Sequence, residues 1–353
     1  MKGLCSKSDI TLPRLYVLGQ QKSGTTAIST ILFQAGALPA VQYSRAREIQ
    51  GHGTDIVKSY TRNLWGTDAN LLLKGAVKES NLLRGVKKPA CWSSSCLSTA
   101  QKKWEERLSF FRNCSSWDTT VLADMSIDNL HKPERASLLQ YFYGPLSQHL
   151  MFIIILRKPI DRFRSGFYWN HPPNYYGHPR GERHAHNRTL HSEIEFLSSV
   201  LPPTFELVQN SWTELQSVSL DAFTRSMYFL NFRPWLDQFQ SRQFAVFPMK
   251  FALGNVSRVT SIVSRHFHVP LVEKPHIFNS NKTVKHKLNP NRYQAVEDVN
   301  TSRGLEWLES TYFAPDTRRL AHLFSTSVSN GMMLAGAMSS SEDDILMFLK
   351  NNW

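Results

Sequence analysis

The segment from Arg14 to Phe33 constrains the fold more than any other part of the sequence. Its residues 15–18 form a short apolar run that is typical of a β-strand and ends at Gly19. A polar loop follows as far as Gly24, and from Thr25 onward apolar residues recur at helical spacing. A strand, a glycine loop and a helix N-terminus together can hold a phosphate, because free backbone N–H groups and the positive end of the helix dipole point at the anion. The sequence therefore predicts a phosphate-binding loop.

This loop differs from that of the nucleoside triphosphatases. Gly19 and Gly24 keep the GxxxxG spacing of a P-loop, but Thr25 stands where the P-loop lysine belongs, and the lysine is Lys22. The segment KSGTT resembles the 5′-phosphosulfate loop of the sulfotransferases that use 3′-phosphoadenosine 5′-phosphosulfate (PAPS), which has the pattern (P)K(S/G/C)GT(T/S). A surface turn with an incidental lysine is the alternative. The resemblance implies that the following residues bind the donor: Lys22, Ser23, Gly24, Thr25 and Thr26.

A second phosphate site is predicted after residue 150. Residues 151–156 form a continuous apolar run, which is typical of a strand buried on both faces of a parallel sheet. The run ends at Arg157, Pro159 suits the first position of a helix, and Ser165 follows about two turns later. Arg157 and Ser165 can therefore converge on one phosphate.

The same stretch resembles the 3′-phosphate motif of the family, LRxPxxRxxS, at Leu156, Arg157, Pro159, Arg162 and Ser165. Two phosphate sites at the ends of two predicted strands imply a ligand with separated phosphates, as PAPS has. The pattern is closest to the Golgi sulfotransferases of heparan and chondroitin type. The resemblance implies that a sulfuryl group moves from PAPS to a hydroxyl of an acceptor, with an amine as the alternative.

The family also uses a glutamate as the base that deprotonates the acceptor. That glutamate follows the proline of a short turn by eight or nine positions, and residues 38–41 resemble this turn. Glu48 lies nine positions after Pro39, so we expect Glu48 to be the base. Lys22 is expected to stabilise the charge that builds on the sulfuryl and leaving phosphate oxygens.

Other residues compete for the role of the base. Glu79 is the second candidate, and His52 and Asp124 come next. Asp124 follows the predicted strand 119–123 and resembles an acid that braces the catalytic lysine or base in the family. Lys88 occupies the glutamate position of a KEPHWW-like segment, but we rank it last because a lysine base needs a strongly depressed pKa.

Strand–loop–helix units recur along the chain, which predicts one α/β domain with a P-loop-like central parallel sheet flanked by helices, the sulfotransferase fold. These units cover residues 15–33, 119–143, 151–169 and 243–267. Residues 217–239 are predicted to form an amphipathic helix whose aromatic residues belong to the core. The expected divisions are a lead at 1–13, a single domain at 14–325 with an insertion or acceptor region at 53–118, and a tail at 326–353.

The composition favours an anionic ligand. The 353 residues carry a net charge of +13 with a pI of about 9.6, which suits a nucleotide donor and an acidic glycan acceptor. A small-molecule acceptor stays open, and we expect no nucleic-acid partner. No apolar run reaches the length of about 18 residues that a transmembrane helix needs, and residues 1–9 do not resemble a signal peptide. Membrane attachment would therefore need an anchor that this sequence lacks.

Cysteines and glycosylation sequons bear on the compartment. Cys91 and Cys96 could close a small disulfide loop. The absence of a CxxC pair argues against zinc, and His184 and His186 have no partner with ligand spacing, so we expect no metal site. Five N-x-S/T sequons, at Asn113, Asn187, Asn255, Asn281 and Asn300, favour the Golgi lumen over the cytoplasm.

Two other classes of protein share the predicted frame. A nucleotide or small-molecule kinase would need a lysine directly after Gly24 and an acid for magnesium. A non-catalytic polyanion-binding protein would keep the donor loops but would lack the base. Binding of the donor nucleotide in preference to ATP excludes the first class, and sulfate transfer excludes the second.

Overall fold

The structure is a computed structural model, and it describes residues 4–6, 8–19, 22–39, 97–98, 101–102, 105, 108, 113–114, 121–124, 129–170, 189–217, 220–254, 256–271, 299–337 and 339–353. Among the described residues, no helix is long and apolar enough to cross a membrane.

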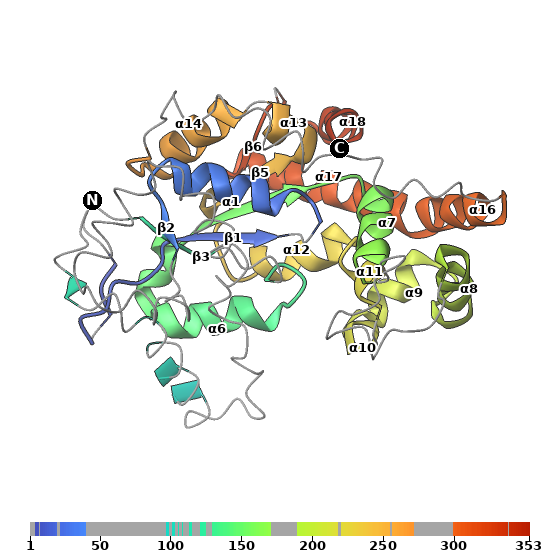
Figure 1. Cartoon of the computed structure of the whole chain (residues 1–353), viewed down its shortest axis with the longest axis horizontal. Helices are drawn as coiled ribbons and strands as arrows, with labels where there is room; N and C mark the ends of the chain where they lie inside the picture. Colours follow the sequence, from blue (N-terminus) through green and yellow to red (C-terminus); the bar gives the residue numbers. More distant parts are fainter. Residues whose placement is uncertain are drawn as a thin grey trace, which may run out of the picture.

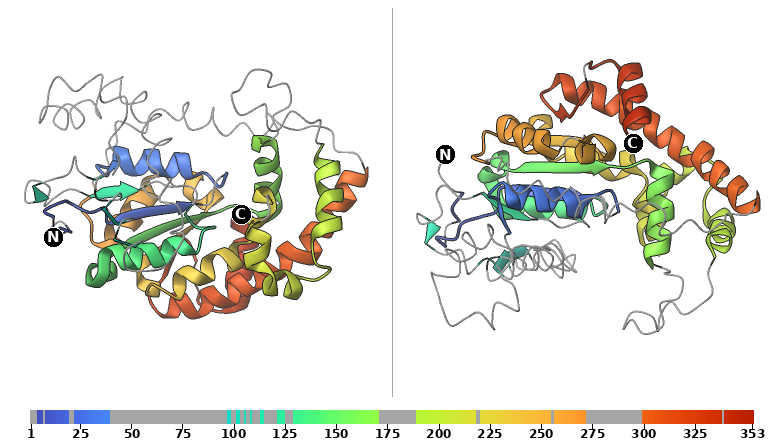
Figure 2. Two further views of the ribbon diagram at one scale, coloured as in Figure 1. Left: turned by 90° about the horizontal axis from the view of Figure 1, so that it is seen from below. Right: turned by 45° about the horizontal axis from the view of Figure 1, so that its top comes forward.

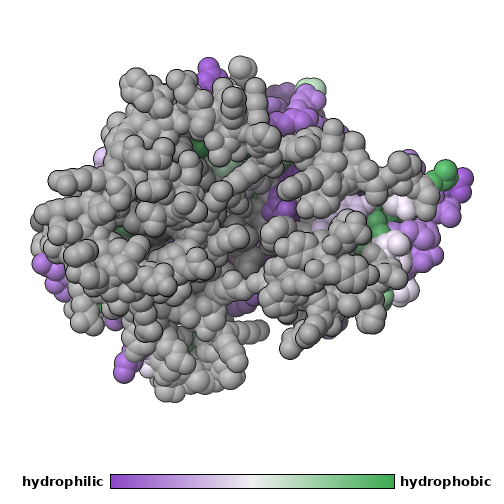
Figure 3. Space-filling model, viewed as in Figure 1, coloured by the Kyte–Doolittle hydropathy of each residue, from purple (hydrophilic) through white to green (hydrophobic). Residues whose placement is uncertain are grey.

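On the face drawn in Figure 3, the visible described side chains over α16 (Val299–Leu308) and α18 (Glu342–Asn352) are mostly hydrophilic.

At the centre of the molecule, the described residues form a sheet of six parallel strands in the order β2-β3-β1-β4-β5-β6. Strands β1, β3, β4 and β5 are buried along their whole length, as expected of strands with helices on both faces. This confirms the predicted α/β class with a central parallel sheet. The strands are β1 (Leu15–Gly19), β2 (Leu38–Pro39), β3 (Leu122–Asp124), β4 (Met151–Leu156), β5 (Phe244–Pro248) and β6 (Met333–Leu334).

The strand order places the two predicted phosphate loops next to each other. Strand β1 pairs with β4 from Leu15 opposite Met151 to Gly19 opposite Ile154. After β1 the chain turns toward β2 and β3, whereas after β4 it turns toward β5 and β6. The connections that leave β1 and β4 therefore run in opposite directions across the sheet, which makes this position a topological switch point. Parallel sheets bind ligands at such points.

Helices cover both faces of the sheet (Figures 1 and 2). Helices α1 and α14 lie on one face and α6 and α12 on the other, while α7 crosses the carboxyl ends of the strands. Helices α8 and α16 lie side by side at the far end of the molecule. The helices not yet given bounds are α1 (Thr25–Gln34), α6 (Glu134–Tyr143), α7 (Pro159–Asn170), α8 (Leu190–Val200), α9 (Phe205–Asn210), α10 (Trp212–Ser217), α11 (Asp221–Thr224), α12 (Tyr228–Leu236), α13 (Met249–Gly254), α14 (Val256–Phe267) and α17 (Ala314–Ser329), with 3-10 turns at Gly144–His149 and Ser241–Gln243 and a π-helical turn at Glu309–Phe313.

The prediction of one helix over residues 217–239 is wrong, although its aromatic residues are buried as expected. The chain forms α11 and then a separate helix α12, and Met227 between them has a non-helical backbone. Asp316 from α17 accepts hydrogen bonds from the first amides of α12, so a side chain distant in sequence fixes where this helix begins. Tyr228 is consequently the first residue of α12.

Residues from both segments that the sequence analysis named the lead and the tail pack against the core of the domain. Leu4, Ile10 and Leu12 are buried in the core. Beyond residue 325, α17 continues to Ser329, β6 joins the sheet beside β5, and α18 follows. Trp353 is also buried, and it stacks on the ring of Tyr228.

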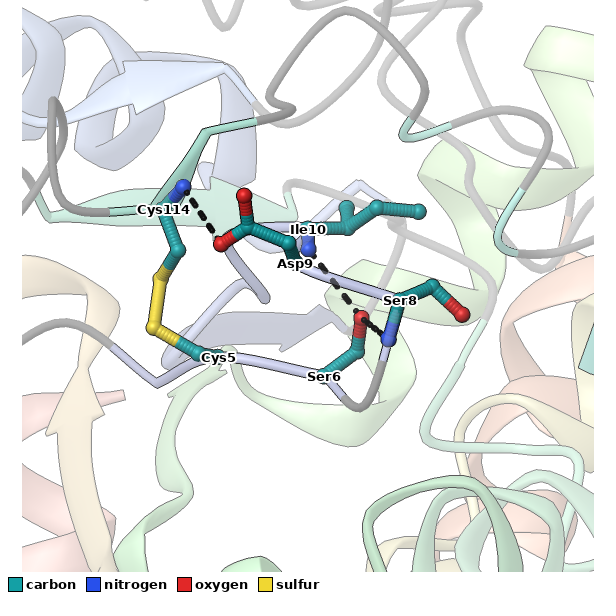
Figure 4. Close-up of a disulfide and its surroundings, with 6 residues drawn as sticks. All are labelled: Cys5, Ser6, Ser8, Asp9, Ile10 and Cys114. Atoms are coloured by element: carbon teal, nitrogen blue, oxygen red, sulfur yellow. Dashed lines mark hydrogen bonds between the residues drawn. A yellow bond between two sulfur atoms is a disulfide. The ribbon is translucent and has the colours of Figure 1, made fainter.

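A disulfide attaches the first residues to the segment before β3. Cys5 is bonded to Cys114, which lies 109 positions later, and the amide of Cys114 donates a hydrogen bond of 3.2 Å to Oδ1 of Asp9 (Figure 4). The sequence did not predict this pairing. The predicted loop between Cys91 and Cys96 lies outside the described residues.

Candidate active site

The described part of the first loop contains two residues with positive φ. Gly24 has φ +92°, and Lys22 has φ +69°, a value that residues with a side chain seldom adopt. A Cβ at Gly24 would also lie 3.3 Å from Cγ of Met249, so this position favours glycine on two grounds. The amides of Ala27 and Ile28 donate hydrogen bonds to the carbonyl of Gly24. The N–H groups of Thr25 and Thr26 therefore come before the first of these helical hydrogen bonds.

The second loop touches the first directly. Arg157 lies just beyond β4 and is half-buried, and its Nη1 donates a hydrogen bond of 3.1 Å to the carbonyl oxygen of Lys22. Nε of Arg157 is buried and has no hydrogen-bond partner among the residues that the structure describes. The two predicted phosphate-binding loops therefore lie in contact at the switch point between β1 and β4.

A tyrosine that the sequence analysis assigned only to the core links the same two loops. The hydroxyl of Tyr228 lies 3.1 Å from Oγ of Ser23 and accepts a hydrogen bond of 3.2 Å from the amide of Arg157. Tyr228 is fully buried, and burial raises the pKa of its phenol, which keeps the hydroxyl neutral. No local pattern distinguishes this tyrosine from the neighbouring core aromatics, because its role depends on where α12 begins.

The other arginine of the second motif is structural. Arg162 is 1% exposed, and its Nη1 donates to the carbonyl of Ala222 at 2.7 Å. Gly166 leaves room for this guanidinium, since a Cβ there would lie 3.1 Å from Nη1 of Arg162. Burial, followed by the charge of Arg225, lowers the pKa of Arg162 to about 9. Arg162 thus fastens α7 to α11 while adding positive charge behind the site.

The electrostatics of the site favour an anion. Burial lowers the pKa of Lys22, and the positive charges of Arg157 and Arg162 lower it further. Burial also lowers the pKa of Arg157, while Asp161 raises it. These cations repel one another in a partly buried site, so the binding of an anion between them lowers the free energy of the site.

The remaining residues predicted to bind the sulfuryl donor lie on the same loops or on the helices that follow them. Ser23 and Thr25 are buried, and Ser165 lies half-buried on α7. Thr26 belongs to the first turn of α1. Because the hydroxyl of Ser23 bonds to Tyr228, this residue faces the protein with its side chain and can offer a ligand its backbone N–H.

Most candidates for the base fall outside the part of the chain that the structure describes. Glu48, Glu79, His52 and Lys88 lie outside the described residues. Asp124 is buried at the end of β3 and pairs in register with Tyr16 of β1. His184 and His186 also lie outside the described part, and within that part no group of three or more His, Cys, Asp or Glu side chains could hold a metal ion.

No family model matches the sequence, and no curated protein matches it. Among solved structures, the chain is similar to a sulfotransferase from Alicyclobacillus acidocaldarius, with a TM-score of 0.46 and 15% identity over 89% of this chain and 96% of that chain. It is also similar to the sulfotransferase domain of the Synechococcus PCC 7002 olefin synthase, with a TM-score of 0.35 and 10% identity over 87% and 98% of the two chains. We therefore infer the function of this chain from its own residues.

Proposed function

We propose that the protein is a sulfotransferase that uses PAPS as its sulfuryl donor. One observation carries the proposal: Arg157, at the end of β4, lies 3.1 Å from the carbonyl of Lys22 in the loop after β1. A ligand that meets both loops needs two separate anionic groups in one molecule. The 5′-phosphosulfate would bind at Lys22 and the start of α1, and the 3′-phosphate at Arg157 and Ser165.

In this proposal the acceptor oxygen attacks sulfur in line, and the bond from sulfur to the leaving phosphate oxygen breaks. Glu48 takes the proton of the acceptor hydroxyl. Lys22 and the backbone N–H groups at the start of α1 stabilise the negative charge that builds on the sulfuryl and phosphate oxygens. The net charge of +13 favours a carbohydrate acceptor.

We place the protein in an oxidising compartment, with the Golgi lumen as the first choice. The disulfide between Cys5 and Cys114 supports this, because disulfides persist in such compartments. Two of the sequon asparagines, Asn113 and Asn300, are exposed and could carry glycans. Enzymatic removal of N-glycans from protein made in secretory cells should increase its electrophoretic mobility, and an unchanged mobility would argue against this placement.

The proposal is tested by ligand binding followed by turnover. The protein should bind 3′,5′-diphosphoadenosine at least about tenfold more tightly than adenosine 5′-monophosphate, since a charged hydrogen bond contributes about 1.5–3 kcal/mol. It should bind ATP with magnesium more weakly than the diphosphate. Tighter binding of ATP would instead support a kinase. A screen with radiolabelled PAPS against glycans, phenols, alcohols and amines then identifies the acceptor, and binding without transfer to any of them would support a non-catalytic polyanion-binding protein.

A further inference from the structure

We infer that Tyr228 is a positioning residue that sets the separation of the two anion-binding loops. Its single hydroxyl contacts Ser23 Oγ at 3.1 Å and the amide nitrogen of Arg157 at 3.2 Å. These atoms belong to the loops after β1 and β4, whereas Tyr228 comes from α12, on the face of the sheet opposite α1. The inference rests on the proposed function, because it concerns the spacing of the two donor phosphates.

The direction of the hydrogen bonds is determined by their chemistry. The amide of Arg157 can only donate, so the oxygen of Tyr228 accepts from it. The phenol proton is then available to Ser23 Oγ. Ser23 is fully buried, so this bond holds the first loop from its protein side and leaves the backbone N–H groups to the ligand.

Two contacts fix Tyr228 itself. The carboxyl group of Asp316 accepts hydrogen bonds from the amides of Phe229 and Leu230, at 3.0 and 3.4 Å, and these bonds anchor the first turn of α12. The ring of Trp353 stacks on the Tyr228 ring at a centroid distance of 5.8 Å and an interplanar angle of 13°. The hydroxyl of Tyr228 therefore has little freedom to move. Because both loops bond to this hydroxyl, its position determines their separation.

The expected consequence concerns ligand discrimination. A ligand with a 5′-phosphate alone needs only the first loop, whereas 3′,5′-diphosphoadenosine needs both loops at the correct spacing. Tyr228→Phe should therefore reduce the preference for the diphosphate over adenosine 5′-monophosphate by about tenfold or more, as expected when two hydrogen bonds are lost. The phenyl ring keeps the stacking on Trp353, so the fold is expected to survive.

The matched control lies at the other end of β1. The hydroxyl of Tyr143 also takes part in two hydrogen bonds, to Tyr16 Oη at 2.7 Å and to the carbonyl of Pro13 at 2.6 Å, and the residue is buried. Tyr143→Phe should lower thermal stability without changing the preference between the two nucleotides. If the wild type prefers the diphosphate and Tyr228→Phe keeps the same preference, the inference is overturned.

A second measurement does not depend on any ligand. In the unliganded protein, the amides of residues 23–25 and of Arg157 should exchange their hydrogens faster in Tyr228→Phe than in Tyr143→Phe. Equal exchange rates in the two variants contradict the inference even if the wild type binds the diphosphate as proposed. Faster exchange in Tyr228→Phe, combined with no preference for the diphosphate in the wild type, supports the link between the loops and refutes the proposed donor.

A double-mutant cycle completes the test. Ser23→Ala removes one of the two contacts of the Tyr228 hydroxyl, so its effect on diphosphate affinity should overlap with that of Tyr228→Phe. The double variant is then expected to bind the diphosphate more tightly than the product of the two separate losses predicts. Simple multiplication of the two effects would show that Ser23 and Tyr228 act separately and would overturn the inference.

Discussion

A buried tyrosine hydroxyl lies near each end of β1 and joins segments that are distant in the sequence, but the surroundings of the two hydroxyls differ. At the amino end, Tyr143 bonds to Tyr16 and to the carbonyl of Pro13, and the nearby charge is the carboxylate of Asp124. At the carboxyl end, Tyr228 joins loops that carry Lys22 and Arg157. Similar hydrogen bonding thus supports packing at one end and gathers cations at the other.

This difference separates stability from binding along a single strand. The polar groups at the amino end bond to one another, so changes there should act on the free energy of unfolding. The cations at the carboxyl end repel one another, so changes there should act on anion affinity. The predictions below test this separation.

The largest expected effect is the loss of the disulfide at the amino end. Replacing both Cys5 and Cys114 by serine releases a closed loop with a sequence separation of 109, which should lower the free energy of unfolding by about 4 kcal/mol. Urea unfolding measures this loss. At a temperature where the variant is folded, its affinity for 3′,5′-diphosphoadenosine should equal that of the wild type. A large fall in that affinity would mean that the two ends of β1 are coupled.

An effect of similar size is expected from Asp316, which anchors the helix of Tyr228. Burial raises the pKa of Asp316 from 3.8 to about 7, although the amides of α12 oppose this. The unfolded chain therefore loses this proton near pH 4 and the folded chain only near pH 7, so the Asp316 contribution to stability falls as the pH rises between these values. The total change is about 4 kcal/mol.

Asp316→Asn keeps an acceptor oxygen but cannot titrate. The difference in unfolding free energy between this variant and the wild type should therefore change steadily between about pH 4 and pH 7 and level off on either side. Urea unfolding over this pH range measures the difference. A constant difference would show that Asp316 has the same pKa in the folded and unfolded chains.

The parts of the molecule that the sequence predicted correctly are those with local patterns. The strand 151–156 is apolar throughout because both of its faces are buried, and Gly24 is required by a positive φ. These features depend on neighbouring residues, so they are visible in a short window. Arg157 was chosen from the same kind of local pattern, since it follows a buried strand, and its role as a phosphate ligand stays a prediction.

The parts that were missed depend on partners far apart in the sequence. Tyr228 resembles any core aromatic until Asp316 fixes the start of α12. The partner of Cys114 is Cys5, and spacing alone favoured a pair of nearer cysteines. The choice of Glu48 as the base stays a prediction, because that residue lies outside the described part of the chain.

Turnover is expected to depend most on Lys22. Lys22→Ala removes the charge nearest the proposed sulfuryl group, which should slow sulfate transfer about a hundredfold, or about 3 kcal/mol. Lys250→Ala is the matched control, since Lys250 is exposed on α13. Single-turnover assays with radiolabelled PAPS compare the two variants. Full activity in folded Lys22→Ala would refute the role of this lysine.

The smallest effect should come from Arg157, and it is selective. Arg157→Ala removes the proposed contact with the 3′-phosphate, so PAPS should bind about tenfold more weakly. Adenosine 5′-phosphosulfate lacks that phosphate, and its affinity should change less. Some loss is still expected for it, because Arg157 also holds the carbonyl of Lys22. The ratio of the two losses, measured by calorimetry, therefore distinguishes a phosphate ligand from a purely structural arginine. Arg233→Ala, at an exposed position on α12, should leave both affinities unchanged, and equal losses for both nucleotides in Arg157→Ala would assign Arg157 to the structure alone.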